Sequence, residues 1–310
     1  MMQPHANKKI LAIFICALSF TVSTKVFAQS QVKSAAESAA NSAISKATSA
    51  GTAITKDFLS TLFPTVEVGV SSGLSNSLTG GILVVAPLSD PKNIYNTVFM
   101  QGSIFLTHED RYRQTVNIGI GDRILTMDKK LLLGANVFYD QEFPYDHKRG
   151  SIGFEARSSV GELNANKYYR LSTWNTGYNN IQEKALSGQD IELGVPLPYM
   201  NWAKVYAKRF KHEGVGTTSD IKGDDLSLRA NLPFGLSVEG GRRNYSTNGI
   251  SDENFVRLTW NSNPPTDEKP LTISNEAYTL TSMEGHRYDK VRRENIIQKQ
   301  KSGKFKITGF

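Results

Sequence analysis

Asp140, Asp146 and His147 lie close together in the sequence and are of types that could perform acid–base chemistry. A carboxylate beside an imidazole can take up and return a proton if the fold holds the two within hydrogen-bond reach. We expect all three in one surface loop, where they could meet. Loop Asp and His residues are ordinarily only solvated, and the chain has no HExxH, GxSxG or CxxC pattern. We therefore predict no catalytic residues, no bound cofactor or metal, and no enzymatic activity.

A second set of charged residues recurs in the middle of segments in which apolar and polar side chains alternate: Glu155, Arg157, Glu192, Arg229, Glu239 and Arg257. A period of two places successive side chains on opposite faces of a strand. On a soluble β-sandwich these charges would face solvent. In a membrane barrel they would line a wet lumen and pair across it, because a lipid-facing arginine at the midplane costs about 2–4 kcal/mol. The charges alone do not decide between the two folds.

Twelve alternating segments position these residues, and they run from Thr65 to Asn261. We expect the strands to begin near Thr65, Leu78, Tyr95, Arg111, Lys130, Arg149, Gly161, Gln189, Met200, Asp224, Phe234 and Glu253. In "NWAKVYAKRF", from Asn201, both faces carry a basic residue, so the sequence does not show which face is apolar. Aromatic residues near strand ends are typical of an interfacial girdle: Tyr139, Tyr168, Tyr169, Trp202, Phe210, Tyr245 and Trp260.

The gaps between these strands favour the membrane barrel. Every second gap is short, around residues 90–94, 122–128, 158–160 and 198–199, and at Pro233. The intervening gaps lengthen through the second half of the chain: 172–187, 211–223 and 244–252. Short turns on one rim and long polar loops on the other are typical of outer-membrane barrels. A soluble sandwich has no reason to sort its loops in this way.

The N-terminal sequence predicts that the chain is exported from the cytoplasm. Residues 1–28 carry Lys8 and Lys9, then an apolar run, then "VFA" before Gln29, which is the pattern of a secretory signal. Its removal takes away Cys16, the only cysteine, and lowers the formal net charge from +7 to +4. This modest excess does not favour nucleic acid as a partner. Mean hydropathy is −0.34 and no apolar run is long enough for a transmembrane helix.

Residues 29–64 have a different composition, rich in Ala, Ser and Thr. Apolar and small residues recur there at helical spacing until Pro64 ends the pattern. We expect a weakly amphipathic helix on the periplasmic side. It is either a loosely helical spacer or a helix that rests against the mouth of the barrel.

Specific motifs resemble the intimin/invasin family of inverse autotransporters. "LLLGANVFYDQEFPYDHKRGSIGFEARSS" (residues 131–159) is similar to the family's N-x-F-Y-D strand end followed by H-x-R-x-G-x-G-x-E, with Ser151 at a usual glycine. "LNANKYYRLSTW", "ELGVPLPYMNWAKVYAKRF" and "GHRYDKVRRENII" resemble further family segments. The matching positions of the first motif are Asn136, Phe138, Tyr139, Asp140, His147, Arg149, Gly153 and Glu155.

The resemblance implies an all-β, 12-stranded antiparallel barrel, integral to the bacterial outer membrane, with its N-terminal segment in the periplasm. It implies outer-membrane lipid, barrel-assembly machinery and periplasmic chaperones as partners. Family barrels (here residues 65–261) export a C-terminal passenger that commonly mediates adhesion. This sequence departs from the pattern in lacking a peptidoglycan-binding domain and in having only 49 residues after Asn261, whereas an immunoglobulin-like domain needs about 100. We therefore expect a passenger-less or truncated translocator whose surface receptor, if any, is unknown.

The tail, residues 262–310, begins with the turn-rich linker "NSNPPTDEKP" and continues with a basic stretch. The resemblance places Arg287, Tyr288, Arg292 and Asn295 inside the lumen. There, acidic residues such as Glu155 and Glu192 could neutralise the arginines, as a buried guanidinium requires. The alternatives are a disordered periplasmic tail and a stand-alone channel or structural barrel that has lost its export function.

Overall fold

The computed structural model describes residues 63–73, 78–108 and 111–302. The predicted signal sequence, nearly all of the predicted helix at 29–64 and the final residues of the predicted tail lie outside the described residues. Residues 63–310 form one compact unit by themselves. In the described part of the chain, no helix is long and apolar enough to cross a membrane.

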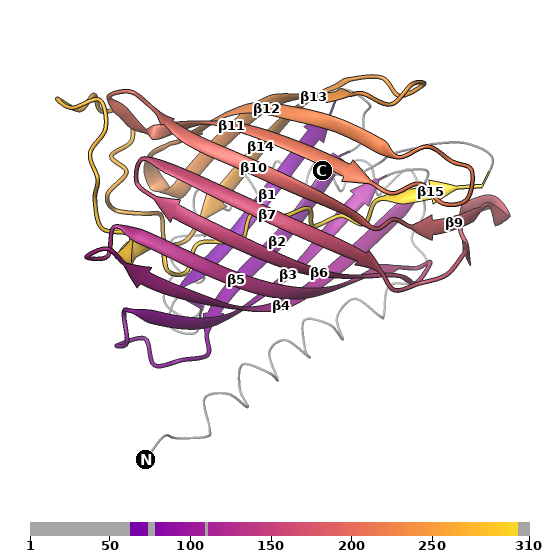
Figure 1. The fold of residues 1–310 in the computed structure, drawn as a ribbon, viewed down its shortest axis with the longest axis horizontal. Helices are drawn as coiled ribbons and strands as arrows, with labels where there is room; N and C mark the ends of the chain where they lie inside the picture. The colour runs from indigo at the N-terminus through magenta and orange to yellow at the C-terminus, as the bar shows by residue number, and fades with distance from the viewer. Residues whose placement is uncertain (1–62, 74–77, 109–110, 303–310) are drawn as a thin grey trace, which may run out of the picture. The chain divides into compact units, whose positions relative to one another are not determined.

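Twelve antiparallel strands form a closed barrel (Figure 1), in the order β1-β14-β13-β12-β11-β10-β7-β6-β5-β4-β3-β2. Pairing of β1 with β14 closes it, with Val68 opposite Trp260. The barrel strands are β1 (Thr65–Gly73), β2 (Leu78–Pro87), β3 (Asn96–His108), β4 (Tyr112–Thr126), β5 (Leu131–Phe143), β6 (His147–Ser158), β7 (Gly161–Arg170), β10 (Gly188–Leu197), β11 (Met200–His212), β12 (Ile221–Asn231), β13 (Leu236–Tyr245) and β14 (Glu253–Asn261).

The predicted barrel is confirmed, and each predicted strand start lies within three residues of the observed one. A second, three-stranded sheet was not predicted. It comprises β8 (Asn175–Thr176) and β9 (Gln182–Ala185), both in the long connection between β7 and β10, and β15 (Lys299–Lys301) from the tail. Three short 3-10 helices complete the described elements: η1 (Tyr178–Asn180), η2 (Pro233–Gly235) and η3 (Glu284–His286).

Loop lengths follow the predicted alternation only in the second half of the barrel. There the long connections are 171–187, 213–220 and 246–252, against turns at 159–160 and 198–199. In the first half, the connection at 88–95 is longer than the opposite one at 144–146. The predicted turn at 122–128 is also too early, because β4 continues to Thr126 and pairs with β5 to its end.

The two faces of each strand differ in the expected sense. Ile118 and Ile120 of β4 are 42% and 51% exposed, while Asn117, on the opposite face of the same strand, is completely buried. Ile191 and Leu193 are likewise exposed, and Glu192 between them is buried. An apolar face on the outside and a polar face on the inside is the arrangement that a lipid-embedded barrel requires.

The structure settles the orientation of β11. Lys204, Tyr206 and Lys208 point inward, where both lysines pair with carboxylates, including Glu162 and Asp225. Arg209 points outward and has a side chain that is 78% exposed. Basic residues therefore occur on both faces because one set lines the lumen and the other lies on the outer surface near the long-loop rim.

The predicted aromatic girdle is only partly correct. Tyr139 and Tyr169 are exposed on the outer face, 39% and 45%. Tyr168 and Phe210 instead face inward and are buried, and Tyr245 packs edge-on against Phe210 at 5.8 Å between ring centroids. These three rings fall on the inward register of their strands, so a position near a strand end did not identify the face.

Two inward-facing glycines make room for aromatic rings. A Cβ atom at Gly119 would lie 2.4 Å from Cδ1 of Phe138, and one at Gly121 would lie 2.5 Å from Cζ of Phe99. Both rings therefore pack directly against the inner wall of β4. They belong to an apolar cluster with Leu83, Val85 and Val291, the last of which comes from the tail.

Candidate functional site in the barrel lumen

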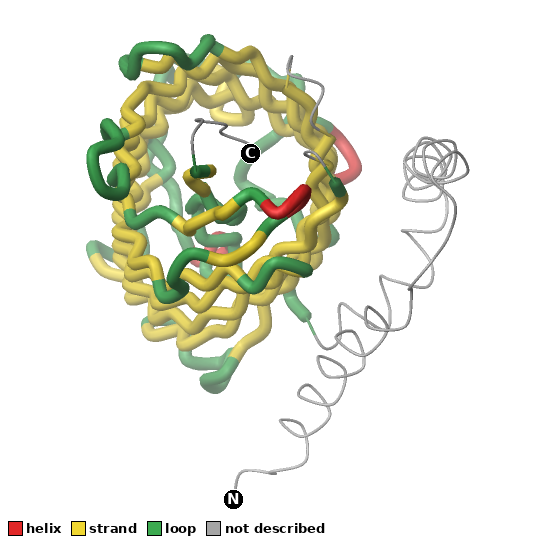
Figure 2. Tube along the Cα trace, turned by 90° about the vertical axis from the view of Figure 1, so that its right-hand side faces the viewer, coloured by secondary structure: helices red, strands yellow, loops and turns green. Residues whose placement is uncertain are grey.

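The lumen contains a continuous stretch of the chain's own tail. Figure 2 looks along the barrel and shows a ring of strands around chain that lies within it. At the short-turn rim, the Met283 amide donates to the carbonyl of Lys129, in the β4–β5 turn, at 2.7 Å. At the opposite rim, β15 pairs antiparallel with β9, beside the long loops (Figure 1). The tail thus has partners at both ends of the barrel.

At the short-turn rim, His286 is held between two carboxylates. Its Nε2 lies 3.0 Å from Asp267 and its Nδ1 lies 2.8 Å from Asp289. Asp289 also accepts from Nη2 of Arg157, on β6, at 2.7 Å. His286 belongs to η3 of the tail and not to a membrane-spanning strand. Burial disfavours the charged imidazolium, but the nearby carboxylates of Asp289 and Asp267 outweigh it and raise the pKa of His286 to about 9.

The predicted tail residues are distributed along this path. Arg287 stays at the short-turn rim, where its guanidinium lies 3.4 and 3.5 Å from the carbonyls of Pro91 and Asn93. Tyr288 packs against the apolar cluster that includes Phe99. The expectation that Arg287 pairs with a lumenal acid is therefore wrong, because its contacts are carbonyl and hydroxyl oxygens of the rim.

Deeper in the lumen, Arg292 pairs with Glu192 of β10 through two nitrogens, with Nη2 and Oε2 3.0 Å apart. Its guanidinium also lies 3.8 Å from the ring centroid of Tyr206. Asn295 accepts from Arg293 at 3.4 Å. Glu155, in contrast, pairs with Arg123 of β4 rather than with a tail arginine.

A fully buried ionic contact involves Arg293, which was not among the predicted site residues. Its two terminal nitrogens donate to the two oxygens of Asp140 at 2.9 and 2.7 Å. Arg149 donates to the same carboxylate at 2.8 Å, and none of the three side chains is exposed. The guanidinium of Arg293 also lies 4.3 Å from the ring centroid of Phe138. Gly119, by leaving space for that ring, therefore helps to position a tail arginine.

The barrel also binds the tail's main chain. Arg123 donates to the carbonyls of Arg287 and Asp289 at 2.9 and 2.6 Å. Arg149 donates to those of Glu294 and Ile296 at 2.7 and 3.2 Å. An extended chain removed from water needs partners for its amides and carbonyls, and these arginines supply them.

Further main-chain contacts come from uncharged side chains of the wall. The amide of Val291 donates to Gln101 at 2.8 Å, and that of Glu294 donates to the hydroxyl of Tyr168 at 2.7 Å. Asn166 donates to the carbonyl of Arg292 at 3.0 Å. Contacts of this kind leave no pattern in the sequence, because they depend on strand register and not on the type of residue in the tail.

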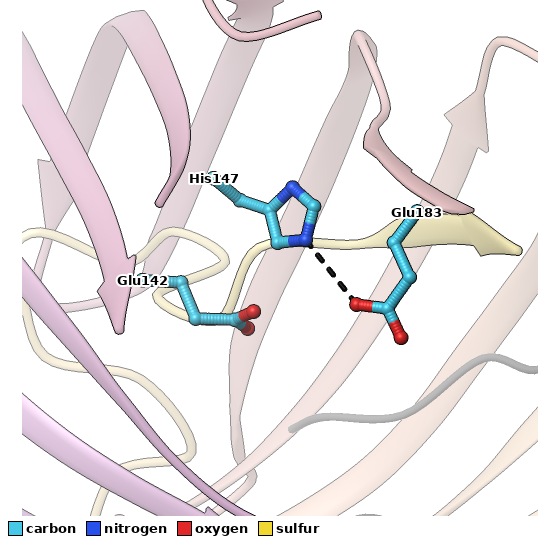
Figure 3. A group of neighbouring side chains, drawn as sticks. All are labelled: Glu142, His147 and Glu183. Carbon is cyan, nitrogen blue, oxygen red and sulfur yellow. Dashed lines mark hydrogen bonds and ion pairs between the residues drawn. The ribbon is translucent and has the colours of Figure 1, made fainter. Parts of the chain in front are cut away.

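Near the long-loop rim, Glu142, His147 and Glu183 converge (Figure 3). Carboxylate and imidazole are metal ligands by type. However, Arg113 donates to Glu142 at 2.9 Å and to Glu183 at 2.8 Å, and Lys299 of the tail pairs with Glu142. These cations already neutralise the carboxylates, so the group is an ionic cluster that ties the tail to β5, β6 and the β7–β10 loop.

The expectation of one loop containing Asp140, Asp146 and His147 is wrong. Asp140 lies within β5 and pairs with arginines, and His147 begins β6 and contacts Glu183 at 3.2 Å. Only Asp146 lies in the turn, where it binds Lys148 at 2.8 Å. The β5 and β6 strands run further toward the surface than expected, and this separates the three side chains.

The six residues predicted to line the lumen all lie on the inward face. Four of them, Glu155, Arg157, Glu192 and Glu239, are buried, and Arg257 contacts Glu239 at 3.2 Å. Arg229 borders two cavities that lie beside the tail in the lumen.

The inward residues of the family motif pack closely. A Cβ atom at Gly153 would lie 2.6 Å from Oδ1 of both Asn136 and Asn166, so a larger residue there would force these amides to shift. Ser151, which replaces the usual glycine of the motif, accepts from Arg293 at 3.1 Å.

The tail does not fill the lumen completely. Two cavities, of about 130 and 220 Å³, lie beside it and share Glu67, Arg229, Ser237, Lys290 and Arg292 in their linings. Of the remaining lining residues that belong to barrel strands, most come from β1, β2 and β11 to β14. The unfilled space is therefore on the side of the barrel where its first and last strands meet.

Comparisons with known proteins agree with this architecture. A family model described as "Inverse autotransporter, beta-domain" matches residues 17–295. Inverse autotransporter adhesin YeeJ of Escherichia coli K12 is 28% identical over 65% of this chain and 9% of its own length. Intimin of E. coli O127:H6 is 28% identical over 76% of this chain and 25% of its own length.

This chain therefore spans a quarter or less of these two relatives. A solved structure titled "Unveiling the Mechanism Behind the in-meso Crystallization of Membrane Proteins" superimposes with a TM-score of 0.63 at 24% identity. It covers 77% of this chain and 99% of that one, and it supports the fold alone.

Proposed function

This chain belongs to the family of inverse autotransporter β-domains, and we propose that its barrel exports the chain's own C-terminal segment to the cell surface. Membership of the family and the closed barrel with an apolar exterior make it an integral outer-membrane protein of the translocator class. The export of its own tail, and insertion by the barrel-assembly machinery with periplasmic chaperones, are parts of the proposal.

One observation carries the proposal: the tail forms ion pairs with the barrel or within itself at the short-turn rim, inside the lumen and near the long-loop rim. His286 pairs with Asp267 and Asp289 at the short-turn rim. Arg293 pairs with Asp140 further along, and Lys299 pairs with Glu142 near the long loops. A tail that stayed in the periplasm would have no use for this series of matched charges. The short turns of such barrels face the periplasm, so the direction of the tail is outward.

The nature of the contacts also suits a conduit. Arg123 and Arg149 bind main-chain carbonyls, which every residue in a passing chain presents. Such a wall can stabilise an extended chain without demanding one sequence. The ion pairs then fix the final resting position of the segment from His286 to Lys299.

We extend the proposal to the cell surface. The relatives that this chain resembles are named an adhesin and an intimin. What this barrel displays is accordingly proposed to act at the cell surface, in contact with a host or neighbouring cell.

A stand-alone channel is the second candidate, and the two cavities beside the tail favour it. They provide water-accessible space through part of the lumen. Against this reading, many charges inside the barrel are engaged by the tail, as in the pair of Arg292 with Glu192.

The test is an epitope tag placed after Phe310 and probed with antibody on intact cells. Export predicts labelling of intact cells at the level seen after outer-membrane permeabilisation. A tag that is reachable only after permeabilisation would rule out export and leave the channel. A tag in the periplasmic-side linker, after Asn263, is the matched control and should be labelled only after permeabilisation.

A further inference from the structure

We propose that the outer face of β7, β10, β11 and β12, at the long-loop rim, binds a phosphate-bearing lipid of the surrounding outer leaflet. This site lies outside the lumen and does not depend on export. It combines a row of cations, an apolar floor beneath them and a hollow in the barrel surface.

The row of cations follows from strand register. Lys167 of β7 lies opposite Gln189 of β10, which lies opposite Lys211 of β11, which lies opposite Lys222 of β12. These side chains therefore stand next to one another on four adjacent strands. Arg209 lies two residues further down β11, opposite Ile191. Long basic side chains can lay their stems along apolar surface and hold their charges at headgroup depth.

An apolar floor lies directly below this row, toward the membrane centre. Phe154 is 62% exposed and Ile191 is 50% exposed, and both face outward. Between them is a hollow of about 670 Å³, lined also by Ile152, Ala165 and the four cations. Because the side chain of Ala165 is small, it leaves a space that is bordered by the neighbouring side chains of Phe154 and Ile191. An acyl chain fits such a hollow, and the phosphate of the same molecule would reach the cations above.

The ion pairs that these cations form within the protein are weak. Lys167 contacts Glu213 at 2.9 Å, Arg209 contacts Asp224 at 2.7 Å, and Lys211 contacts Asp220 at 2.9 Å. Lys222 reaches Asp220 only at 3.8 Å. All these side chains are about one-third or more exposed, and exposed pairs of this kind contribute little to stability. Four cations face three carboxylates, so the lysines can turn to a phosphate without breaking a strong interaction.

The feature is confined to one side of the barrel. At the same rim, the outward positions of β3, β4 and β5 carry Leu106, Tyr112, Gln114 and Tyr139, and none of the outward residues described there is lysine or arginine. General solubility at the rim would not require this asymmetry. A ligand that carries both phosphate and acyl chains would contact the cations and the hollow together. Free phosphate would contact the cations alone and leave the hollow empty.

The experiment uses the folded chain in a neutral detergent, titrated with diphosphoryl lipid A and followed by native mass spectrometry. The variant is Lys167→Gln/Lys211→Gln/Lys222→Gln. The matched control, Lys92→Gln/Lys130→Gln/Lys269→Gln, removes three exposed lysines at the opposite rim. Heat-modifiable migration on gels verifies that each barrel is folded. If the triple variant does not fold, Lys211→Gln alone, at a position where the side chain is 41% exposed, provides the test.

We expect lipid A to bind the triple variant about 10-fold more weakly than wild type, and Lys211→Gln about 3-fold more weakly. The control and the triple Lys→Arg variant should bind as wild type does. Lipid A without its phosphates should bind wild type as weakly as the triple variant binds the intact lipid. Equal affinities for wild type and the triple variant would overturn the proposal. So would displacement of the lipid by inorganic phosphate at equal concentration, because the site would then recognise the anion alone.

Discussion

Arg293 of the tail and Asp140 of β5 form a two-point ion pair, at 2.9 and 2.7 Å, and neither side chain is exposed. A single tail residue is thus bound inside the barrel by a carboxylate that also binds Arg149. Removing charges from water is costly, and good geometry with several hydrogen bonds is needed to offset that cost. This pair is therefore a sensitive point at which to test the position of the tail.

The substitution Asp140→Asn should destabilise the folded barrel by about 3–5 kcal/mol, because it leaves two buried guanidinium groups without a counter-charge. Urea unfolding in detergent, followed by tryptophan fluorescence, measures the loss. Asp252→Asn, which removes the partner of exposed Arg242, is the control and should cost no more than about 1 kcal/mol.

If the tail is bound as described, adding Arg293→Met to Asp140→Asn should recover part of the loss. Purely additive effects in this double-mutant cycle would contradict a direct interaction.

Gly119→Ala should destabilise the barrel by about 1–3 kcal/mol, because the new methyl group would collide with the ring of Phe138 and force the packing to shift. That ring in turn supports Arg293. The matched control is Gly240→Ala, since a Cβ atom there meets nothing within 4 Å. Equal stability of the two variants in urea would show that the close approach at Gly119 has no energetic consequence.

The pairing of His286 predicts a loss of stability at alkaline pH. Its pKa is raised from 6.5 to about 9 in the folded protein, so its ion pairs stabilise fully below pH 6.5. This contribution falls as the pH rises through 9, where the folded-state imidazolium loses its proton. The free energy of unfolding in urea should accordingly decrease between pH 6.5 and pH 9.5.

In His286→Gln this part of the decrease should be absent, whereas His108→Gln, at an exposed position, should follow wild type. A His286→Gln profile parallel to that of wild type would mean that another group is responsible.

Deletion of residues 284–310 should raise the single-channel conductance of the barrel in planar bilayers several-fold. Twelve strands enclose room for water once the tail is removed, whereas at present the two cavities beside it are only about 130 and 220 Å³. Deletion of residues 303–310 alone leaves all the described lumen contacts in place and should not change the conductance. An unchanged conductance after the longer deletion would show that the tail does not block the pore.

The strands were predictable from sequence because their signals are local. Alternation in segments such as "DIELGVPL" (residues 190–197) reports which face is apolar, and turn residues mark where strands end. The same signals predicted an inward-facing Glu192, whereas the placement of Arg292 in the lumen came from the family resemblance.

Most of the tail's binding partners were not predictable. Arg123 binds carbonyls of the tail, and a carbonyl is present at every residue, so no residue type marks the contact. Pairing of β9 with β15 joins segments more than a hundred residues apart, and neither is long enough to show a period. The side chain of Tyr168 points inward because of its register in β7. A position near a strand end does not reveal that register.

A tail that crosses the barrel from the periplasm to the surface has its two ends in different compartments. The most direct measurement is labelling of single cysteines by a membrane-impermeant maleimide on intact cells, in a Cys16→Ser background. Ser302→Cys, just beyond β15, and Ser282→Cys, just before η3, are both exposed positions at opposite ends of the described lumenal segment. Ser302→Cys should be labelled on intact cells and Ser282→Cys only after outer-membrane permeabilisation. Labelling of both positions only after permeabilisation would contradict a tail that crosses the barrel.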